Sequence, residues 1–334
     1  YYASCSFIDQ NGIVLNNSLK RGTVKLNLDH QLVKFLKVGT ALAYDKWTDR
    51  DVPENQRNGV IARLYTTLPN IGIRDVDNPA EYARSPFIND LENPVSTVYQ
   101  PDHKFSNSRV HGNVYAEAEV ATGLKVKSLL GFEKSDGLFT SFQDSVQTRY
   151  GQSLKGLAAE NTYDYKYWIS ENTANFNTQV DKHNVALMGG FIASRQINDN
   201  LYKSSHDFTG APDNSVESGN VKATPYSDYA RLSHAAIIGR LNYSYDEKYY
   251  LTSNFRADGS GQFSPEHKWG YFPSFSAGWK LSEEDFFKVA GINELKLRAG
   301  WGIVGNDRSR PYAWYGLVDT LQKYLIGGQA QPAF

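Results

Sequence analysis

The sequence predicts an all-β fold, an antiparallel transmembrane β-barrel with long loops at one rim. Three features predict it. Segments of about ten residues alternate between apolar and polar side chains, and a tilted strand needs about this length to cross a bilayer. The connections between these segments are alternately short and long. Aromatic residues make up 13% of the chain, with 22 Tyr and 6 Trp. Their apolar bodies and the polar tips of Tyr and Trp suit a boundary between lipid and water.

The alternating segments occur from the first thirty residues to the last third of the chain. In the earliest clear one, Val24 and Leu26 point to one side and Lys25 and Asn27 to the other. The segment 109–120 has the cleanest alternation, and further segments begin near residues 124, 241, 249 and 295. We count roughly eleven or twelve strand-like segments, each with one apolar and one polar face.

The connections are sorted by length. Tight turns are predicted at 120–124, near 180–182 and at 245–249. Long polar connections are expected at approximately 45–106, 135–161 and 195–231, and a short helix at 56–68 in the first of them. Outer-membrane barrels combine short periplasmic turns with long extracellular loops. A soluble β-sandwich also alternates, but nothing requires it to sort its loops in this way.

Composition excludes several classes of protein. Lys+Arg number 35 and Asp+Glu 36, so no net basic charge favours nucleic acid as a partner. Cys5 is the single cysteine, which rules out an internal disulfide and a cysteine-based metal site. The mean hydropathy is −0.51 and no run of about 18 apolar residues occurs, so a helical membrane protein is excluded and a barrel is not.

Three stretches in the last third of the chain resemble a known family. They read RADGSGQF from residue 256, WGYFPSFSAGW from residue 269, and LKLRAGWG from residue 295, leading to Gly-Asn at 305–306. They are similar to the barrel signatures of the SusC/RagA family of TonB-dependent outer-membrane transporters from Bacteroidota. Gly261 and Gly300 stand where the family usually has Ser, both small-for-small changes. The matching residues are Arg256, Asp258, Gly259, Ser260, Phe263, Phe272, Pro273, Ser274, Gly278, Trp279, Leu295, Arg298, Gly305 and Asn306.

The resemblance implies a 22-stranded barrel that encloses an N-terminal plug. Residues 1–334 would form about half of that barrel, with no plug domain present; the segment 329–332 is not expected to be a strand. The resemblance further implies the cell outer membrane, contact with its lipid, and import of oligosaccharides or peptides. A SusD-like surface lipoprotein would cap the barrel, TonB would act through the missing plug region, and transporter–lipoprotein pairs could form a dimer. No enzyme activity and no cofactor are expected.

Two other functions remain open from the sequence. One is a single-chain TonB-dependent siderophore or cobalamin receptor, which needs no lipoprotein. The other is a secreted glycan-binding β-protein whose aromatic faces pack as a core. An outer-membrane enzyme is more distant, because no nucleophile–base arrangement occurs.

The polar faces supply the candidates for side chains that line the barrel. Glu117 and Glu119 share one strand face about 7 Å apart. A carboxylate pair can serve acid/base catalysis, but lysines nearby favour a polar wall. The seven histidines lack metal-ligand spacing. The segment with Asp75, Asp77 and Asn78 lacks the glycine and the distal glutamate of a Ca²⁺ loop. A turn is therefore predicted at 75–78. The lumen-facing candidates are Arg109, Glu117, Glu119, Lys125 and Arg256.

An aromatic cluster beside a long connection has two interpretations. Tyr163, Tyr165, Tyr167 and Trp168 could form part of the aromatic girdle at the membrane interface, which alternate tyrosines favour. They could instead stack against sugar rings, which makes all four candidates for substrate contact.

Overall fold

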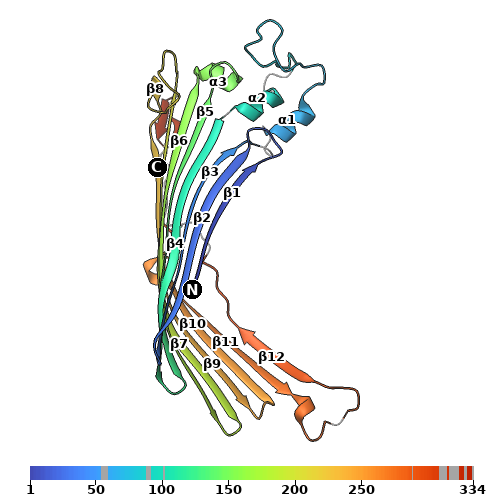
Figure 1. Cartoon of the computed structure of the whole chain (residues 1–334), viewed down its shortest axis with the longest axis vertical. Helices are drawn as coiled ribbons and strands as arrows, with labels where there is room; N and C mark the ends of the chain where they lie inside the picture. Colours follow the sequence, from blue (N-terminus) through green and yellow to red (C-terminus); the bar gives the residue numbers. More distant parts are fainter. Residues whose placement is uncertain are drawn as a thin grey trace.

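The protein is described from a computed structural model, which covers residues 1–53, 59–87, 92–100, 102–287, 289–307 and 314–315, and the backbone of 323–326 and 329–332. Most of these residues form one antiparallel sheet, in which each strand pairs with the next along the chain (Figure 1). The strands on its path are β1 (Tyr2–Asn11), β2 (Ser18–Val33), β3 (Leu36–Asp51), β4 (Asp102–Ala121), β5 (Leu124–Gln143), β6 (Leu157–Val180), β7 (His183–His206), β9 (Tyr226–Tyr245), β10 (Tyr249–Ser260), β11 (Trp269–Lys280) and β12 (Lys296–Gly302).

The remaining elements are short. The two-residue strand β8 (Val221–Lys222) pairs with β7, and β13 (Lys323–Ile326) pairs with β14 (Gln329–Pro332) in a separate sheet. The helices are α1 (Val60–Thr66), α2 (Pro94–Tyr99), α3 (Arg149–Leu154) and the 3-10 turns η1 (Pro265–His267) and η2 (Leu281–Glu283). Within the described residues, no helix has the length and apolarity to cross a membrane.

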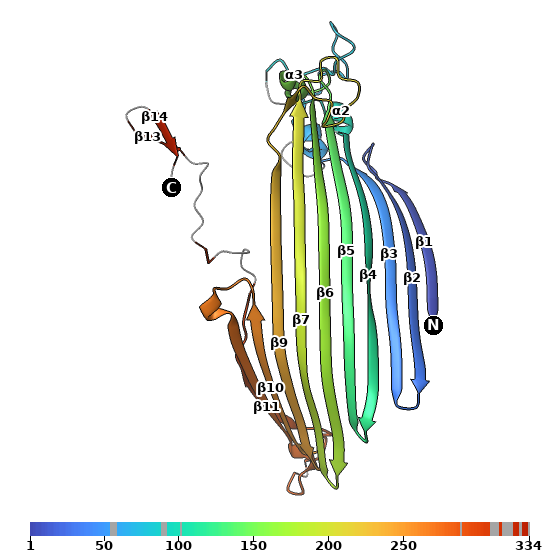
Figure 2. The same ribbon diagram turned by 90° about the vertical axis from the view of Figure 1, so that its left-hand side faces the viewer.

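The sheet is curved and open, with β1 and β12 at its two edges (Figures 1 and 2). It is a partial β-barrel, as the sequence predicts. Twelve strands, counting β8, belong to it in the described part of the chain, in agreement with the expected eleven or twelve.

The two rims differ in the length of their connections (Figure 2). One rim has tight turns at 34–35, 122–123, 181–182 and 246–248, and the other has long loops at 52–101, 144–156 and 207–225. Gly123 has φ 78° and Asp181 has φ 50°, so the tight turns use the left-handed region that Gly favours and Asp tolerates. One connection departs from the predicted pattern: residues 281–295 form a longer link at the short-turn rim.

The predicted loop bounds are too wide, because the strands extend into them. The loops expected at 45–106, 135–161 and 195–231 shorten to 52–101, 144–156 and 207–225. β6 and β7 each have 24 residues, about 80 Å at roughly 3.3 Å per residue, far more than a bilayer requires. Alternation marks only the part of a strand in contact with lipid. Beyond it the simple alternation is lost, but backbone pairing between the strands continues.

Two smaller predictions are also corrected. The helix expected at 56–68 is shorter, since α1 covers Val60–Thr66 and residues 54–58 lie outside the described residues. The segment 329–332 is a strand, β14, because it pairs locally with β13 and places Pro332 at its end, where a missing N–H is tolerated.

Register divides the sheet into two chemically different faces. We call the apolar one the outer face; Leu26, Leu42, Gly112, Phe132 and Trp168 lie opposite one another along it across five strands. The polar one, the inner face, carries the row Thr23, Asp45, Arg109, Ser135 and Tyr165.

The outer face has no second layer over it in the described structure. Leu130, Phe191 and Phe275 are each 47–49% exposed, and the small buried apolar cluster consists of Val52, Val60 and Val98 beneath a loop rather than under the sheet. A β-sandwich buries its apolar face against a second sheet. The secreted β-protein alternative is therefore inconsistent with this single layer, whose outer face suits lipid.

Aromatic rings line the outer face of the last strands. Tyr249 stacks on Trp279 at 6.3 Å between ring centroids, and Phe275 stacks on Trp301 at 6.2 Å. Glu284, in the connection beyond β11, accepts hydrogen bonds from the Tyr249 hydroxyl at 2.6 Å and from Trp279 Nε1 at 2.9 Å. Both hydrogen bonds lower the pKa of Glu284, and the bond from Tyr249 has the larger effect. Trp269, Tyr271, Phe275 and Trp279 all lie on this face by their register.

Adjacent leucines on β5 test the assignment of the faces. In the protein reconstituted in lipid, Leu130→Arg places a cation on the outer face and should lower the free energy of unfolding from lipid by about 2–4 kcal/mol. Leu129→Arg places the same residue on the inner face and should cost less. Refolding into vesicles, followed by heat-modifiable gel mobility, measures both; an equal loss in the two variants contradicts the assignment.

Candidate functional site

A ladder of charges crosses the inner face near the long-loop end of β2 to β5. Asp45 is only 2% exposed and accepts hydrogen bonds from Arg21 Nη2 at 2.6 Å and from Thr23 Oγ1 at 2.7 Å. On the next strands, Arg109 Nη2 donates to Glu133 Oε2 at 2.8 Å. Each charge thus has a partner of opposite sign on a neighbouring strand, so the wall is charged but locally neutral.

The remaining lumen-facing candidates lie on the same face. Glu117 is directly opposite Lys37 on one side and Lys127 on the other, and Glu119 is opposite Lys125. The lysines opposite these carboxylates give this part of the wall charges of both signs, which suits a polar wall better than an acid/base pair. That these residues line a lumen stays a prediction.

The tyrosine cluster is divided between the two faces. Register places Tyr163, Tyr165 and Tyr167 on the inner face and Trp168 on the outer face. The favoured girdle interpretation is therefore wrong for the three tyrosines and fits Trp168 alone. Tyr163 packs edge-on against Phe105 at 6.1 Å, a neighbour that the local sequence does not indicate.

Charged residues on the outer face show why the girdle interpretation fails for the three tyrosines. Asp164 and Lys166 form an ion pair at 3.0 Å, as do Lys134 and Asp136 at 3.2 Å on the neighbouring strand. These pairs lie on the outer face on the long-loop side of Trp168, so the apolar band ends at Trp168 and the strand continues in water. Alternation within 163–168 cannot show this, since both sides of the strand carry polar groups there.

The family-like stretches meet around one hollow on the inner face. The hollow has a volume of about 780 Å³. Its lining includes Arg256, Asp258, Ser260, Phe263, Phe272, Gly305 and Asn306, joined by Glu171 and His234 from β6 and β9.

Two contacts shape this hollow. Arg256 Nε is held by both carboxylate oxygens of Asp258, at 2.8 and 2.6 Å, which fixes the guanidinium in place. The chain after β12 crosses the face, where Gly305 lies against the ring of Phe272; a Cβ at Gly305 would come within 2.2 Å of that ring. His234 Nδ1 lies 3.3 Å from Asp307 Oδ2 in the same segment.

The other family-like residues have structural roles at the strands. Asn254 Nδ2 donates to Ser274 Oγ at 3.1 Å, and Ile303 N donates to Pro273 O at 3.0 Å. Gly259 lies against the ring of Trp269, Gly278 lies opposite Arg298, and Ser282 N donates to Leu295 O at 3.3 Å. These contacts hold β10, β11 and β12 together. They give the uncharged residues of the family-like stretches a structural role.

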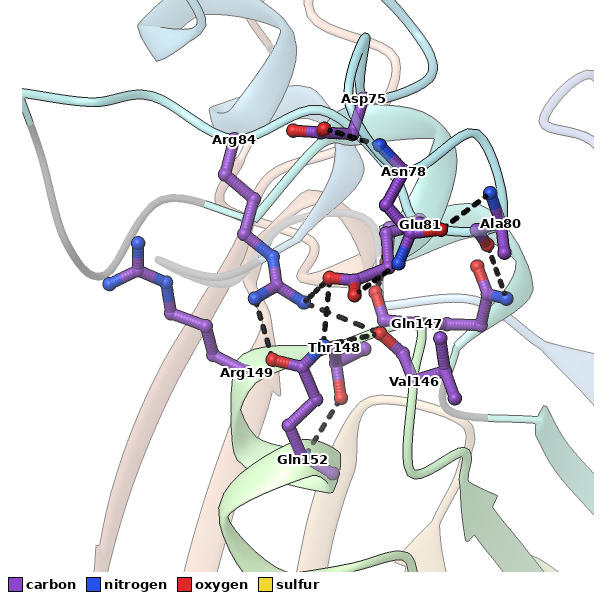
Figure 3. Close-up of polar contacts among 12 residues, drawn as sticks. Asp75, Asn78, Ala80, Glu81, Arg84, Val146, Gln147, Thr148, Arg149 and Gln152 are labelled. Atoms are coloured by element: carbon purple, nitrogen blue, oxygen red, sulfur yellow. Dashed lines mark hydrogen bonds and ion pairs between the residues drawn. The ribbon is translucent and has the colours of Figure 1, made fainter.

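At the long-loop rim, two loops form one unit, which we call the loop cap: residues 59–87, 92–100 and 144–156 (Figure 3). Gln152 of α3 joins the two loops. Its Oε1 accepts from Arg84 Nη1 at 2.8 Å, and its Nε2 donates to Glu81 Oε2 at 2.9 Å and to Val146 O at 2.9 Å. Gln147 Nε2 adds a bond to Ala80 O at 3.1 Å.

Buried polar groups make the loop cap rigid. Asn93 is 5% exposed and its Nδ2 donates to Gly72 O and Ala83 O, each at 3.0 Å. Ser96 is fully buried and donates to Gln147 O at 3.0 Å. Such groups hold a loop firmly because each would cost about 1–3 kcal/mol if left unpaired. No sequence motif indicates these contacts.

The carboxylates in the loops serve as turn centres. Asp75 Oδ1 accepts from the N–H groups of Asp77 and Asn78 at 2.9 and 3.0 Å, which confirms the predicted turn. In the loop 207–225, bonds from the side chains of Ser215 and then Ser218 lower the pKa of Asp213 to about 2. No group of three His, Cys, Asp or Glu side chains able to hold a metal ion occurs among the described residues.

Gln152→Leu should separate the two loops of the loop cap, because it removes three hydrogen bonds and leaves Glu81 and Arg84 without their bridge. Hydrogen exchange of residues 59–87 should become faster, while the barrel strands remain protected. Ser153→Ala in the same helix removes one local bond to Tyr150 O and is the matched control. Unchanged exchange in Gln152→Leu contradicts a joint loop cap.

Gly305→Ala should destabilise the hollow, because the added methyl group must displace the Phe272 ring. A loss of about 1–3 kcal/mol in the free energy of unfolding is expected, as for other overpacked sites. Gly22→Ala, where an added Cβ meets no atom within 4 Å, should have little effect. Equal unfolding midpoints in denaturant for the two variants would show that the contact is unimportant.

The chain is similar in sequence to several known proteins. No protein-family model matches the chain. TonB-dependent receptor P26 of Formosa agariphila is 30% identical over 98% of this chain and 33% of its own length. TonB-dependent receptor P39 of the same organism is 31% identical over 92% of this chain and 29% of its own. TonB-dependent receptor SusC of Bacteroides thetaiotaomicron is 28% identical over 91% of this chain and 32% of its own length.

Solved structures share the fold as well. The RagAB peptide transporter superposes on 99% of this chain and 38% of its own with a TM-score of 0.80 and 19% identity. The ferric preacinetobactin receptor BauA from Acinetobacter baumannii superposes on 83% of this chain and 40% of its own, with a TM-score of 0.51 and 12% identity. The chain spans about one third of the length of its curated relatives. It is a homologue, over nearly all of its own length, of the outer-membrane TonB-dependent receptors, SusC among them.

Proposed function

We propose that this chain forms part of the wall and loops of an outer-membrane importer of the SusC type, which takes up oligosaccharides or peptides. The observation that carries the proposal is the single-layer sheet with an apolar outer face and a charged inner face. Such a wall separates lipid from a polar passage. The proposal involves no bond made or broken in the cargo, so we expect no enzyme activity.

The chemistry of the inner face supports a polar cargo. Arg109 and Glu133, together with Tyr165 and Tyr167, offer hydrogen-bond donors and acceptors and flat aromatic surfaces side by side on β4 to β6. Sugars and peptides need both kinds of contact. Tyr163 also lies on this face, and we propose these tyrosines as contacts for cargo; Trp168, on the outer face, is withdrawn from that set.

The loop cap supports a protein partner at the long-loop rim. Tyr65 is 87% exposed, Phe87 77% and Leu64 60%, all on the loop 59–87. Exposed apolar side chains on an otherwise rigid, polar scaffold are typical of a surface that binds another protein. We propose a SusD-like lipoprotein as that partner, which the resemblance to the SusC/RagA family implies. We propose TonB as the source of energy, in line with the names of the relatives.

Co-purification tests the partner. The tagged full-length receptor, extracted in mild detergent, should bring with it a lipoprotein in equal amount, identified by mass spectrometry. Tyr65→Asp should lose the lipoprotein because it puts a charge into the apolar contact, whereas Tyr65→Phe should keep it. A wild-type receptor that purifies alone contradicts the SusC-type proposal and leads to the siderophore or cobalamin alternative.

Uptake tests the function itself. Cells that carry the receptor should import the oligosaccharide or peptide held by the lipoprotein, and import should stop when TonB is deleted. Uptake of a ferric siderophore, with no effect of removing the lipoprotein, would favour the alternative instead.

A further inference from the structure

Charged residues on the outer face follow one order on each long strand from β2 to β9. From the apolar band toward the long-loop rim, the first residue among Asp, Glu, Lys and Arg is always a Lys or an Arg. We call these residues the cation belt. In strand order they are Lys20, Lys46, Lys104, Lys134, Lys166, Arg195 and Arg231. A boundary that faced only water would not require the same sign of charge on every strand.

The apolar stretch beneath the cation belt sets its height in the membrane. On β6, whose residues are all described, the outer face from Trp168 to Val180 carries no Asp, Glu, Lys or Arg. This stretch is about 40 Å long at about 3.3 Å per residue, and a strand tilt of about 40° reduces its height to about 30 Å. The hydrocarbon core of a bilayer has about this thickness. Lys166, the next outward residue after Trp168, therefore lies at the level of the lipid headgroups.

On β5, β6 and β7, which lie side by side (Figure 2), a carboxylate follows the cation. The carboxylates lie opposite one another in one row and belong to Asp136, Asp164 and Asp199. They are about 7 Å beyond the cation along β5 and β6 and about 13 Å beyond it along β7. The charge thus changes sign along each strand, from positive beside the hydrocarbon to negative farther from it.

These charges are paired with one another at the surface. Lys134 Nζ lies 3.2 Å from Asp136 Oδ1, and Lys166 Nζ lies 3.0 Å from Asp164 Oδ1, but the four side chains are 34–55% exposed. Exposed ion pairs contribute little to stability because water competes for both partners. Register also places like charges directly opposite, Lys134 with Lys166 and Asp136 with Asp164, which is unfavourable between adjacent strands. A ligand that brings both signs of charge relieves this repulsion.

We infer that the outer face of β5 to β7 binds a lipid headgroup of the phosphoethanolamine type. In such a headgroup the phosphate lies next to the hydrocarbon, and a primary ammonium group is carried outward from it. Lys134, Lys166 and Arg195 can donate charge-assisted hydrogen bonds to the phosphate, and Asp136 and Asp164 can accept them from the ammonium group. The order of charges in the headgroup is the complement of the order on the strands.

The same order of charges disfavours other headgroups. A headgroup with a phosphate and no ammonium group leaves the carboxylate row without a partner. A choline headgroup has the right charges, but its quaternary nitrogen has no N–H to donate to Asp164. The inference rests on the outer face lying in the membrane, as the proposed function requires, and does not depend on which cargo is carried.

Lipid binding to the full-length receptor tests the headgroup. The receptor in mild detergent is titrated with phosphatidylethanolamine, phosphatidylcholine or phosphatidylglycerol with the same acyl chains, and the bound lipid is counted by native mass spectrometry. Phosphatidylethanolamine should bind most tightly. Lys166→Gln should weaken its binding about fivefold, as expected for one cation at a membrane surface. Asp164→Asn should bind phosphatidylethanolamine and phosphatidylcholine equally, because the acceptor for the ammonium group is lost.

A matched variant separates the headgroup contact from a general effect of charge. Lys203→Gln makes the same change on the outer face of β7, about 26 Å beyond Arg195 along the strand, and should bind lipid like the wild type. Heat-modifiable gel mobility shows that each variant has folded. Equal binding of the three lipids, tightest binding of phosphatidylglycerol, or an equal loss in Lys203→Gln and Lys166→Gln overturns the inference. None of these outcomes bears on the import assay.

Discussion

Backbone hydrogen bonding within a single layer is the constraint on which the rest of this structure depends. A strand in lipid must pair with a neighbour along its whole apolar length, because lipid supplies no partner for its N–H and C=O groups. Consecutive strands meet this need by pairing in order from β1 to β12. Since side chains alternate between the faces, the same pairing separates an apolar surface from a charged one. No second layer is needed, and the buried apolar core is correspondingly small.

Charges on the inner face are paired, which stabilises the wall and still leaves polar groups that can bind a molecule. Asp45 is buried between Arg21 and Thr23, and Arg109 reaches Glu133 on the next strand. Pairs of opposite sign on adjacent strands compensate one another where water is partly excluded. The aromatic side chains beside them add flat surfaces. A passage lined in this way can bind a polar molecule at many points, each of them weak enough to release it.

The loops at the long rim and the hollow on the inner face follow a different principle from the wall. In the loop cap, buried amides and hydroxyls such as those of Asn93 and Ser96 take the place of an apolar core. In the hollow, Gly305 is needed only because the returning chain passes directly over Phe272. Both sites join segments that are distant in sequence. Their order therefore depends on the sheet, which brings the ends of those segments together.

The sequence by itself determined the period of two, the positions of the tight turns and the residues that share a strand face, because these depend on near neighbours in the chain. It also carried the family-like stretches. It did not determine which face the tyrosines at 163–167 occupy, since polar groups stand on both sides there. The ends of the strands and the bonds of the loop cap were likewise decided by tertiary structure. Arg84 and Gln152 are 68 residues apart, and only pairing across intervening strands brings them within hydrogen-bonding distance.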